Sequence, residues 1–202
     1  MKYLEKFQTL LPIGYLYLIL LGLIDETLQY YPLGINILNY SSITDILLRP
    51  IAEIFSSPVF IIVVISIVLI LFIVQTIVVN YCYKKRGEKV FGEKRFNEDV
   101  TKKEVQKAIF PIFILFVAFE LLSIFVGLGI KGGDIISKKI SQSDFTCNYR
   151  VNFSSGKTQD IYLFDQNSSY YFYAVKGNKN IMIAPVGSTT SLELIHNKRL
   201  NK

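Results

Sequence analysis

The run from residue 58 to residue 83, PVFIIVVISIVLILFIVQTIVVNYCY, limits the folds open to this chain more than any other part of its sequence. It contains no charged side chain. It is also longer than the roughly 20 helical residues that cross a hydrocarbon core of about 30 Å. The sequence therefore predicts a membrane-spanning helix here.

Two further apolar blocks, at about 9–27 and 108–130, reach the same length range. Of the 202 residues 51% are hydrophobic, and they are gathered in blocks rather than spread evenly as in a soluble core. The first block follows the short segment MKYLEK but ends in LLGLIDETLQYY without a small-residue cleavage site, so we interpret it as an uncleaved signal anchor. We expect a membrane α-helical protein with three transmembrane helices in residues 1–140.

The basic loop 84–107 between the second and third spans sets the expected orientation. It holds nine Lys or Arg against five acids, and the positive-inside rule puts such a loop in the cytoplasm. The N-terminus is then cytoplasmic as well, and the C-terminal region lies outside. The Lys- and Ile-rich composition, with only Cys82 and Cys147 as cysteines, predicts no disulfide framework and favours a bacterial inner (plasma) membrane.

Residues 42–56 predict a helix that does not cross the membrane. Ser41 or Ser42 can cap it, with Asp45 in its first turn. Apolar residues recur at helical spacing: Ile43, Ile46, Leu47, Ile51 and Ile54. Two readings of this amphipathic helix stay open: it lies at the membrane interface, or it is a re-entrant segment lining a pathway.

From about residue 145 the pattern changes to period two, which predicts a small β-rich soluble domain over 145–202. Turn-type clusters separate five short aromatic and β-branched runs: CNYRVNF, QDIYLF, SYYFYAVK, NIMIAPV and SLELI. They favour a small antiparallel sheet or an SH3-like barrel. A domain this small is marginal alone, so we expect support from the membrane, a neighbouring subunit or a partner.

The aromatic string in the third of these runs marks a candidate binding surface. Tyr170, Tyr171, Phe172 and Tyr173 put rings on both faces of one strand, so one face can fill the core while the other needs covering. With Lys176 nearby in a basic domain, they form a candidate surface for a protein, lipid, oligonucleotide or small nucleotide-type ligand.

The third apolar block contains one carboxylate, Glu120, near its middle. An acidic residue at a helix centre costs about 2.5–3.5 kcal/mol to insert, so its side chain should face protein or water. Ser123 and Gly127 extend a polar-to-small stripe at helical spacing, and Gln75 in the second span is a candidate neighbour. Three readings stay open: a protonated, hydrogen-bonded structural group, a ring of carboxylates in the pore of a homo-oligomer, or a proton-relay site.

Gly127, Gly129 and Gly132 match the dinucleotide-binding pattern G-x-G-x-x-G, but they follow a membrane span instead of a strand. We expect them to end the helix and form a hinge, with Gly127 also permitting close helix packing. The sole histidine, His196, has no nearby Cys or acid pair, and the common hydrolase, metalloenzyme and NTPase signatures are missing from the sequence. We therefore expect no enzyme, no metal site and no cofactor.

The segment YYPLGINILNYSSITDILL, followed by a strong span, a basic loop, another span and a β-rich tail, resembles the layout of small multi-span membrane proteins of bacteria. The layout also resembles membrane-channel effectors of antiphage-defence operons. In those effectors a few spans oligomerise into a channel that stays shut until a signal arrives. The resemblance implies a homo-oligomer in a lipid bilayer that responds to a regulatory partner.

Two functions are consistent with this layout. The first is a homo-oligomeric membrane channel or membrane-perturbing effector that is gated or regulated through its β domain. The alternative is a non-conducting, membrane-anchored binding module.

Overall fold

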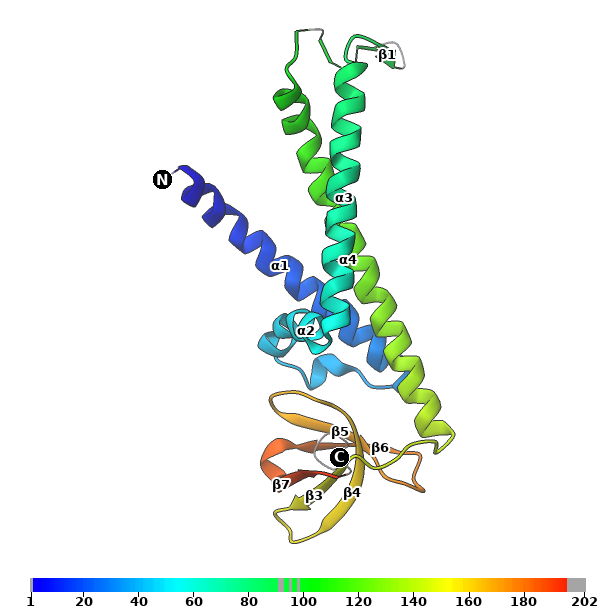
Figure 1. The fold of residues 1–202 in the computed structure, drawn as a ribbon. Coiled ribbons are helices and arrows are strands. Elements are labelled where there is room, and N and C mark those ends of the chain that lie inside the picture. The colour runs from blue at the N-terminus through cyan, green and yellow to red at the C-terminus, as the bar shows by residue number, and fades with distance from the viewer. Residues whose placement is uncertain (1, 91–92, 95, 98, 196–202) are drawn as a thin grey trace. The chain divides into compact units, whose positions relative to one another are not determined.

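The computed structural model describes residues 2–90, 93–94, 96–97 and 99–195, so His196 and parts of the basic loop 84–107 lie outside the described residues. Within them, four α-helices precede a five-stranded antiparallel sheet (Figure 1). The prediction of three long apolar helices and a C-terminal antiparallel β domain is confirmed at this level. By its internal contacts the chain divides into two compact units, residues 1–50 with 125–202, and residues 51–124.

Helix α1 (Lys2–Tyr30) belongs to the first unit. The segment Leu11–Leu33 is long and apolar enough to cross a membrane, and its charged residues are confined to Asp25 and Glu26. Two short 3-10 helices follow, η1 (Tyr31–Leu33) and η2 (Ile37–Asn39). Gly34 ends η1 in the left-handed region with a φ of 70°, where glycine is favoured.

Helix α2 (Ile43–Ser56) begins where the capping signal predicted. Ser42 is the cap: its hydroxyl accepts from the Asp45 amide at 3.1 Å, and its own amide donates to the Asp45 carboxylate at 3.0 Å. This reciprocal pair satisfies two amides that the first turn of a helix leaves without partners. Ser41, the other predicted cap, instead donates to Glu26 of α1 at 2.8 Å.

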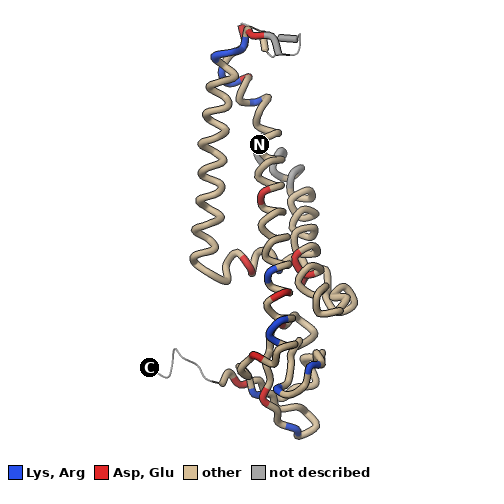
Figure 2. The backbone as a smooth tube through the Cα atoms, turned by 90° about the vertical axis from the view of Figure 1, so that its right-hand side faces the viewer, with Lys and Arg blue, Asp and Glu red and all other residues tan. Residues whose placement is uncertain are grey.

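Helix α3 (Pro58–Lys84) lies in the second unit, and its most apolar 18-residue stretch has a mean hydropathy of 3.2. Figure 2 shows no charged residue along it before its last turn. The short strands β1 (Lys89–Val90) and β2 (Glu93–Lys94) then pair as a hairpin. Near the end of α3, Val79 and Cys82 form a buried cluster with Val105 at the beginning of α4.

Helix α4 (Lys102–Ser141) starts at a second capping pair, in which the Thr101 amide donates to Glu104 at 2.8 Å. It is also long and apolar enough to span a membrane. It continues without interruption through Gly127, Gly129 and Gly132, so the prediction that these glycines end the helix is wrong. None of them adopts the left-handed conformation that terminates a helix.

The sheet of the β domain has the strand order β6-β5-β4-β3-β7, with every pair antiparallel. Its strands are β3 (Tyr149–Phe153), β4 (Thr158–Gln166), β5 (Tyr170–Ala174), β6 (Ile181–Pro185) and β7 (Thr189–Leu194). All five fall on the predicted runs, and the predicted turn clusters connect them. Gly156 and Gly177 supply the left-handed backbone in two of these turns, with φ of 82° and 83°.

Both faces of β5 are covered. Tyr173 joins Val151 and Ile161 in the core on one face. On the other, Phe172 packs edge-to-face on Tyr30 at the end of α1, with ring centroids 5.0 Å apart. The expectation that the second face of this strand needs covering is confirmed, and residues 30–40 of the same chain supply the cover.

Candidate functional site

A buried polar cluster joins α1, α2 and β4 around Arg49. Its guanidinium contacts Asp165 at 2.8 Å and Asp25 at 3.3 Å, and it donates to the side-chain oxygen Oε1 of Gln29 at 2.8 Å. Gln29 also donates from its amide to Asp165 at 2.9 Å. The side chains of Arg49, Asp25 and Asp165 are only 18%, 3% and 15% exposed. We call these four residues the Arg49 cluster.

Local structure explains why these side chains meet. Asp25 and Gln29 are one helical turn apart, so they present side chains on the same face of α1. In β4 a bulge inserts Phe164 as an extra residue, so Asp165 pairs with Phe172 of β5. Because paired residues of antiparallel strands share a face, the bulge turns Asp165 to the side on which Phe172 meets α1.

The electrostatics of the cluster favour the charged arginine. Burial acts to lower the pKa of Arg49, but the charge and hydrogen bond of Asp165 and the charge of Asp25 outweigh it and raise that pKa above its usual value. One guanidinium thus makes ion pairs with two carboxylates, and Glu26 is buried nearby. Among the described residues no group of three or more potential metal-ligating side chains occurs, and a cation already occupies the centre of this cluster.

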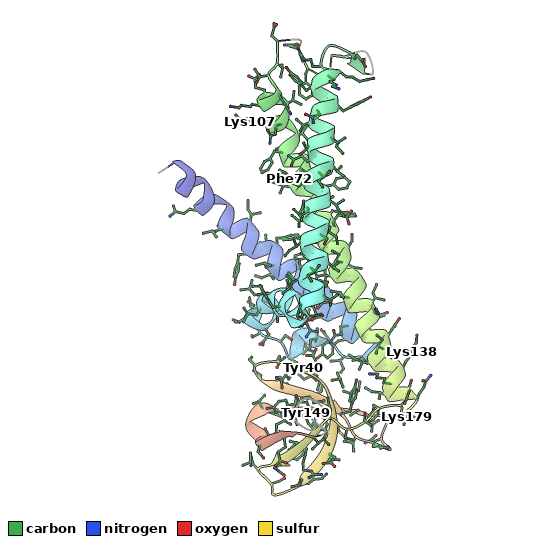
Figure 3. All side chains as sticks on the ribbon, viewed as in Figure 1. Tyr40, Phe72, Lys107, Lys138, Tyr149 and Lys179 are labelled. Carbon is green, nitrogen blue, oxygen red and sulfur yellow. The ribbon has the colours of Figure 1, made fainter. Side chains whose placement is uncertain are left out.

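A second contact lies beside the Arg49 cluster, between the first turn of α2 and the turn that connects β4 to β5. Asp45 accepts from the Ser168 amide at 3.2 Å and from its hydroxyl at 3.0 Å. Burial acts to raise the pKa of Asp45, but hydrogen bonds from Ser42 and Ser168 prevail and lower it. Asn167 donates from its side chain to the Tyr40 carbonyl at 3.1 Å, and Tyr40 lies at this end of the sheet (Figure 3).

The predicted stripe on α4 is largely uncovered. Ser123 is exposed and donates to the Phe119 carbonyl of its own helix at 2.9 Å, while a Cβ added to Gly127 would meet nothing within 4 Å. Glu120 is half-buried and makes no hydrogen bond or ion pair with another described residue. The stripe is therefore a free polar surface on a helix that is otherwise apolar in this region.

Gln75 is buried in α3, 6% exposed, and its amide nitrogen has no hydrogen-bond partner among the described residues. It lies on the same face as Val79 and Cys82, which pack against α4. The structure gives no hydrogen bond between Gln75 and Glu120 within the part of the chain it describes. The two predicted neighbours are thus not joined directly.

The aromatic string is not an exposed stacking surface. Phe172 and Tyr173 are 1% and 7% exposed, and Tyr170 and Tyr171 pack beside the two cores that flank β5. Of the five residues predicted as a ligand surface, Lys176 alone is exposed. The rings are buried because both faces of β5 pack in apolar cores, and a domain this small has few other large side chains to fill them.

No protein-family model, curated protein or solved structure matches the chain.

Proposed function

We propose that this protein is a homo-oligomeric membrane channel or membrane-perturbing effector that is regulated through its β domain. The observation that carries the proposal is Glu120, a carboxylate near the middle of an apolar helix without a partner in its own chain among the described residues. Neither α3 before Lys84 nor α4 between residues 108 and 130 contains a Lys or Arg that could neutralise it.

An assembly of several copies of the chain can keep the Glu120 carboxylate out of contact with lipid. A charged carboxylate exposed to lipid costs several kcal/mol, so it faces protein or water. The exposed Ser123 and Gly127 continue the same stripe, and small or polar residues let helices of neighbouring subunits approach closely. A symmetric assembly would then bring several Glu120 side chains around one axis, where a ring of carboxylates attracts cations.

The Arg49 cluster supports regulation through the β domain. It connects Asp165 of β4 directly with α1 and α2. A partner that shifts the sheet would therefore act on Asp25 and Gln29 of α1 without an intervening flexible linker.

Ion flux through liposomes tests the proposal. We expect cation-selective flux with the wild-type chain and reduced selectivity with Glu120→Gln, which keeps the shape and removes the charge. Asp99→Asn, an exposed carboxylate outside the stripe, is the matched control and should leave selectivity unchanged. A chain that is strictly monomeric in mild detergent and in native membranes would contradict the proposal, as would equal selectivity in all three proteins.

A second candidate is the non-conducting, membrane-anchored binding module. It is favoured by a groove in the β domain, lined by Phe153, Lys157, Tyr173 and Met182, that no segment of the described chain fills.

A further inference from the structure

The groove lies at the end of the sheet opposite to the contact with α2. It has a volume of about 460 Å³ and runs between the β3–β4 and β5–β6 hairpins. Asp165 and Ser168 mark the other end of the same strands, because β4 is antiparallel to both of its neighbours. A ligand in this groove would therefore leave the Arg49 cluster free.

The lining combines apolar surface with a hydrogen-bond donor. Phe153, Val175 and Met182 supply the apolar part and are only half-buried. Tyr173 is 7% exposed, and its hydroxyl has no hydrogen-bond partner among the described residues. Burial raises the pKa of Tyr173, so the hydroxyl remains protonated and available as a donor.

The charge around the groove has one sign. The two hairpins that flank it, residues 153–159 and 173–182, carry Lys157, Lys176 and Lys179 and no Asp or Glu. Lys157 lines the groove itself, and Lys179 lies in the turn between β5 and β6 (Figure 3). Such a rim attracts an anionic partner and repels a cationic one.

Three anionic partners can be compared. If α2 lies at the membrane interface, the bilayer meets the end of the sheet that contacts α2, which is the end away from this groove. An oligonucleotide would need exposed rings for base stacking, but Tyr173 is buried. An acidic peptide fits best, because an apolar side chain can fill the half-buried part while carboxylates reach Lys157 and the Tyr173 hydroxyl.

We propose that this groove binds an acidic peptide segment of a partner protein, anchored by one apolar side chain against Phe153 and Met182. The proposal deepens the regulatory role of the β domain and does not require the chain to conduct ions.

The test uses the full chain in lipid nanodiscs and an array of acidic decapeptides that each carry one central Leu or Phe. Matched peptides with Lys in place of every acid serve as the reference. We expect only acidic peptides to bind, with affinity falling about tenfold or more in Lys157→Glu and several-fold in Tyr173→Phe. Lys138→Glu, the same charge change at an exposed position on α4 (Figure 3), should leave binding unchanged.

Two sets of results would overturn the proposal. In the first, no acidic peptide binds, or Lys138→Glu lowers peptide affinity as much as Lys157→Glu. The other is tighter binding of oligo-dT or of phosphatidylglycerol vesicles that depends on Lys157. Peptide binding is measured independently of ion flux. A chain that binds acidic peptides but conducts no ions would therefore contradict the proposed channel and support the proposed peptide-binding groove.

Discussion

Arg49 of α2 and Asp165 of β4 form a 2.8 Å ion pair in which both side chains are mostly buried. The β domain offers a natural comparison in Arg150 and Asp160, which form an equally short pair of 2.7 Å with side chains 46% and 45% exposed. The two pairs share chemistry and differ in burial. Burial decides how much free energy of unfolding is lost when the arginine is replaced, because solvent can stabilise an exposed carboxylate that loses its partner.

Arg49→Met should therefore destabilise the chain by about 3–5 kcal/mol, since it leaves Asp25 and Asp165 close together without a cation. Arg150→Met should lower the free energy of unfolding much less, because solvent stabilises the exposed Asp160. Thermal and urea unfolding in mild detergent, followed by circular dichroism, measures both. Equal and small losses would show that water reaches the Arg49 cluster.

A double variant separates charge from packing in the same experiment. Adding Asp165→Asn to Arg49→Met removes the charge of one of the two carboxylates that contacted the arginine. The double variant should therefore be more stable than Arg49→Met alone. A double variant that is no better than the single one would assign the loss to packing of the arginine stem instead.

Local signals in the sequence predicted the elements of this fold well. The uncharged run 58–83 forms α3 (Pro58–Lys84), and Ser42, one of two suggested caps, begins α2. The five strands of the β domain also fall where period-two runs and turn residues placed them. These successes share a cause, because each signal depends only on neighbours within a few residues.

The Arg49 cluster could not be predicted in the same way. Asp165 lies 116 positions from Arg49 and 136 from Gln29, and the bulge at Phe164 that turns it toward them has no distinctive sequence pattern. A usable signal did exist nearby. Asp25 and Gln29 are spaced one turn apart at the end of an apolar helix, and Arg49 is the sole cation between the first two apolar blocks.

The glycines of α4 show how one residue type can be misread. Glycine was predicted to end the helix because it often adopts the left-handed conformation there. In the structure Gly129 and Gly133 instead let α4 approach the backbone of α1: an added Cβ would lie 2.6 Å from the Asp25 carbonyl oxygen and 2.4 Å from that of Gln29. Their four-residue spacing is the small-xxx-small pattern of close helix packing.

This packing predicts opposite effects for glycines of the same helix. Gly129→Ala and Gly133→Ala should each destabilise the chain by about 1–3 kcal/mol, because the new methyl group meets fixed backbone atoms. Gly127→Ala should leave the stability of the single chain unchanged or raise it by up to about 1 kcal/mol, since within the chain its Cβ enters open space and alanine favours a helix. Unfolding midpoints of the three variants in one detergent give the comparison. Equal effects at all three positions would mean that α1 does not pack on this face.

The carboxylate of Asp45 makes stability depend on pH in a defined direction. Burial opposes its ionisation, but hydrogen bonds from Ser42 and Ser168 lower its folded pKa below the unfolded value of about 3.9. A lowered folded pKa means that the unfolded chain binds the proton more readily, so the stabilisation is complete above the unfolded value and is lost as the pH falls through the folded pKa. Asp45→Asn should therefore be less stable than wild type at pH 6–7, by about 0.5–1 kcal/mol, because the charge at the first turn of α2 is lost.

The difference in stability between wild type and Asp45→Asn is the quantity to follow, because other carboxylates titrate in both proteins. It should shrink as the pH is lowered from about 5 to below 4, where the wild-type side chain becomes neutral as well. Ser168→Ala is the matched control: it removes one donor to Asp45, so introducing it into both proteins should narrow the difference between them at pH 6–7. A difference that stays constant down to pH 3, with or without Ser168, would show that Asp45 contributes to the contact between α2 and the sheet through its second acceptor oxygen, which asparagine replaces with an NH2 group, rather than through its charge.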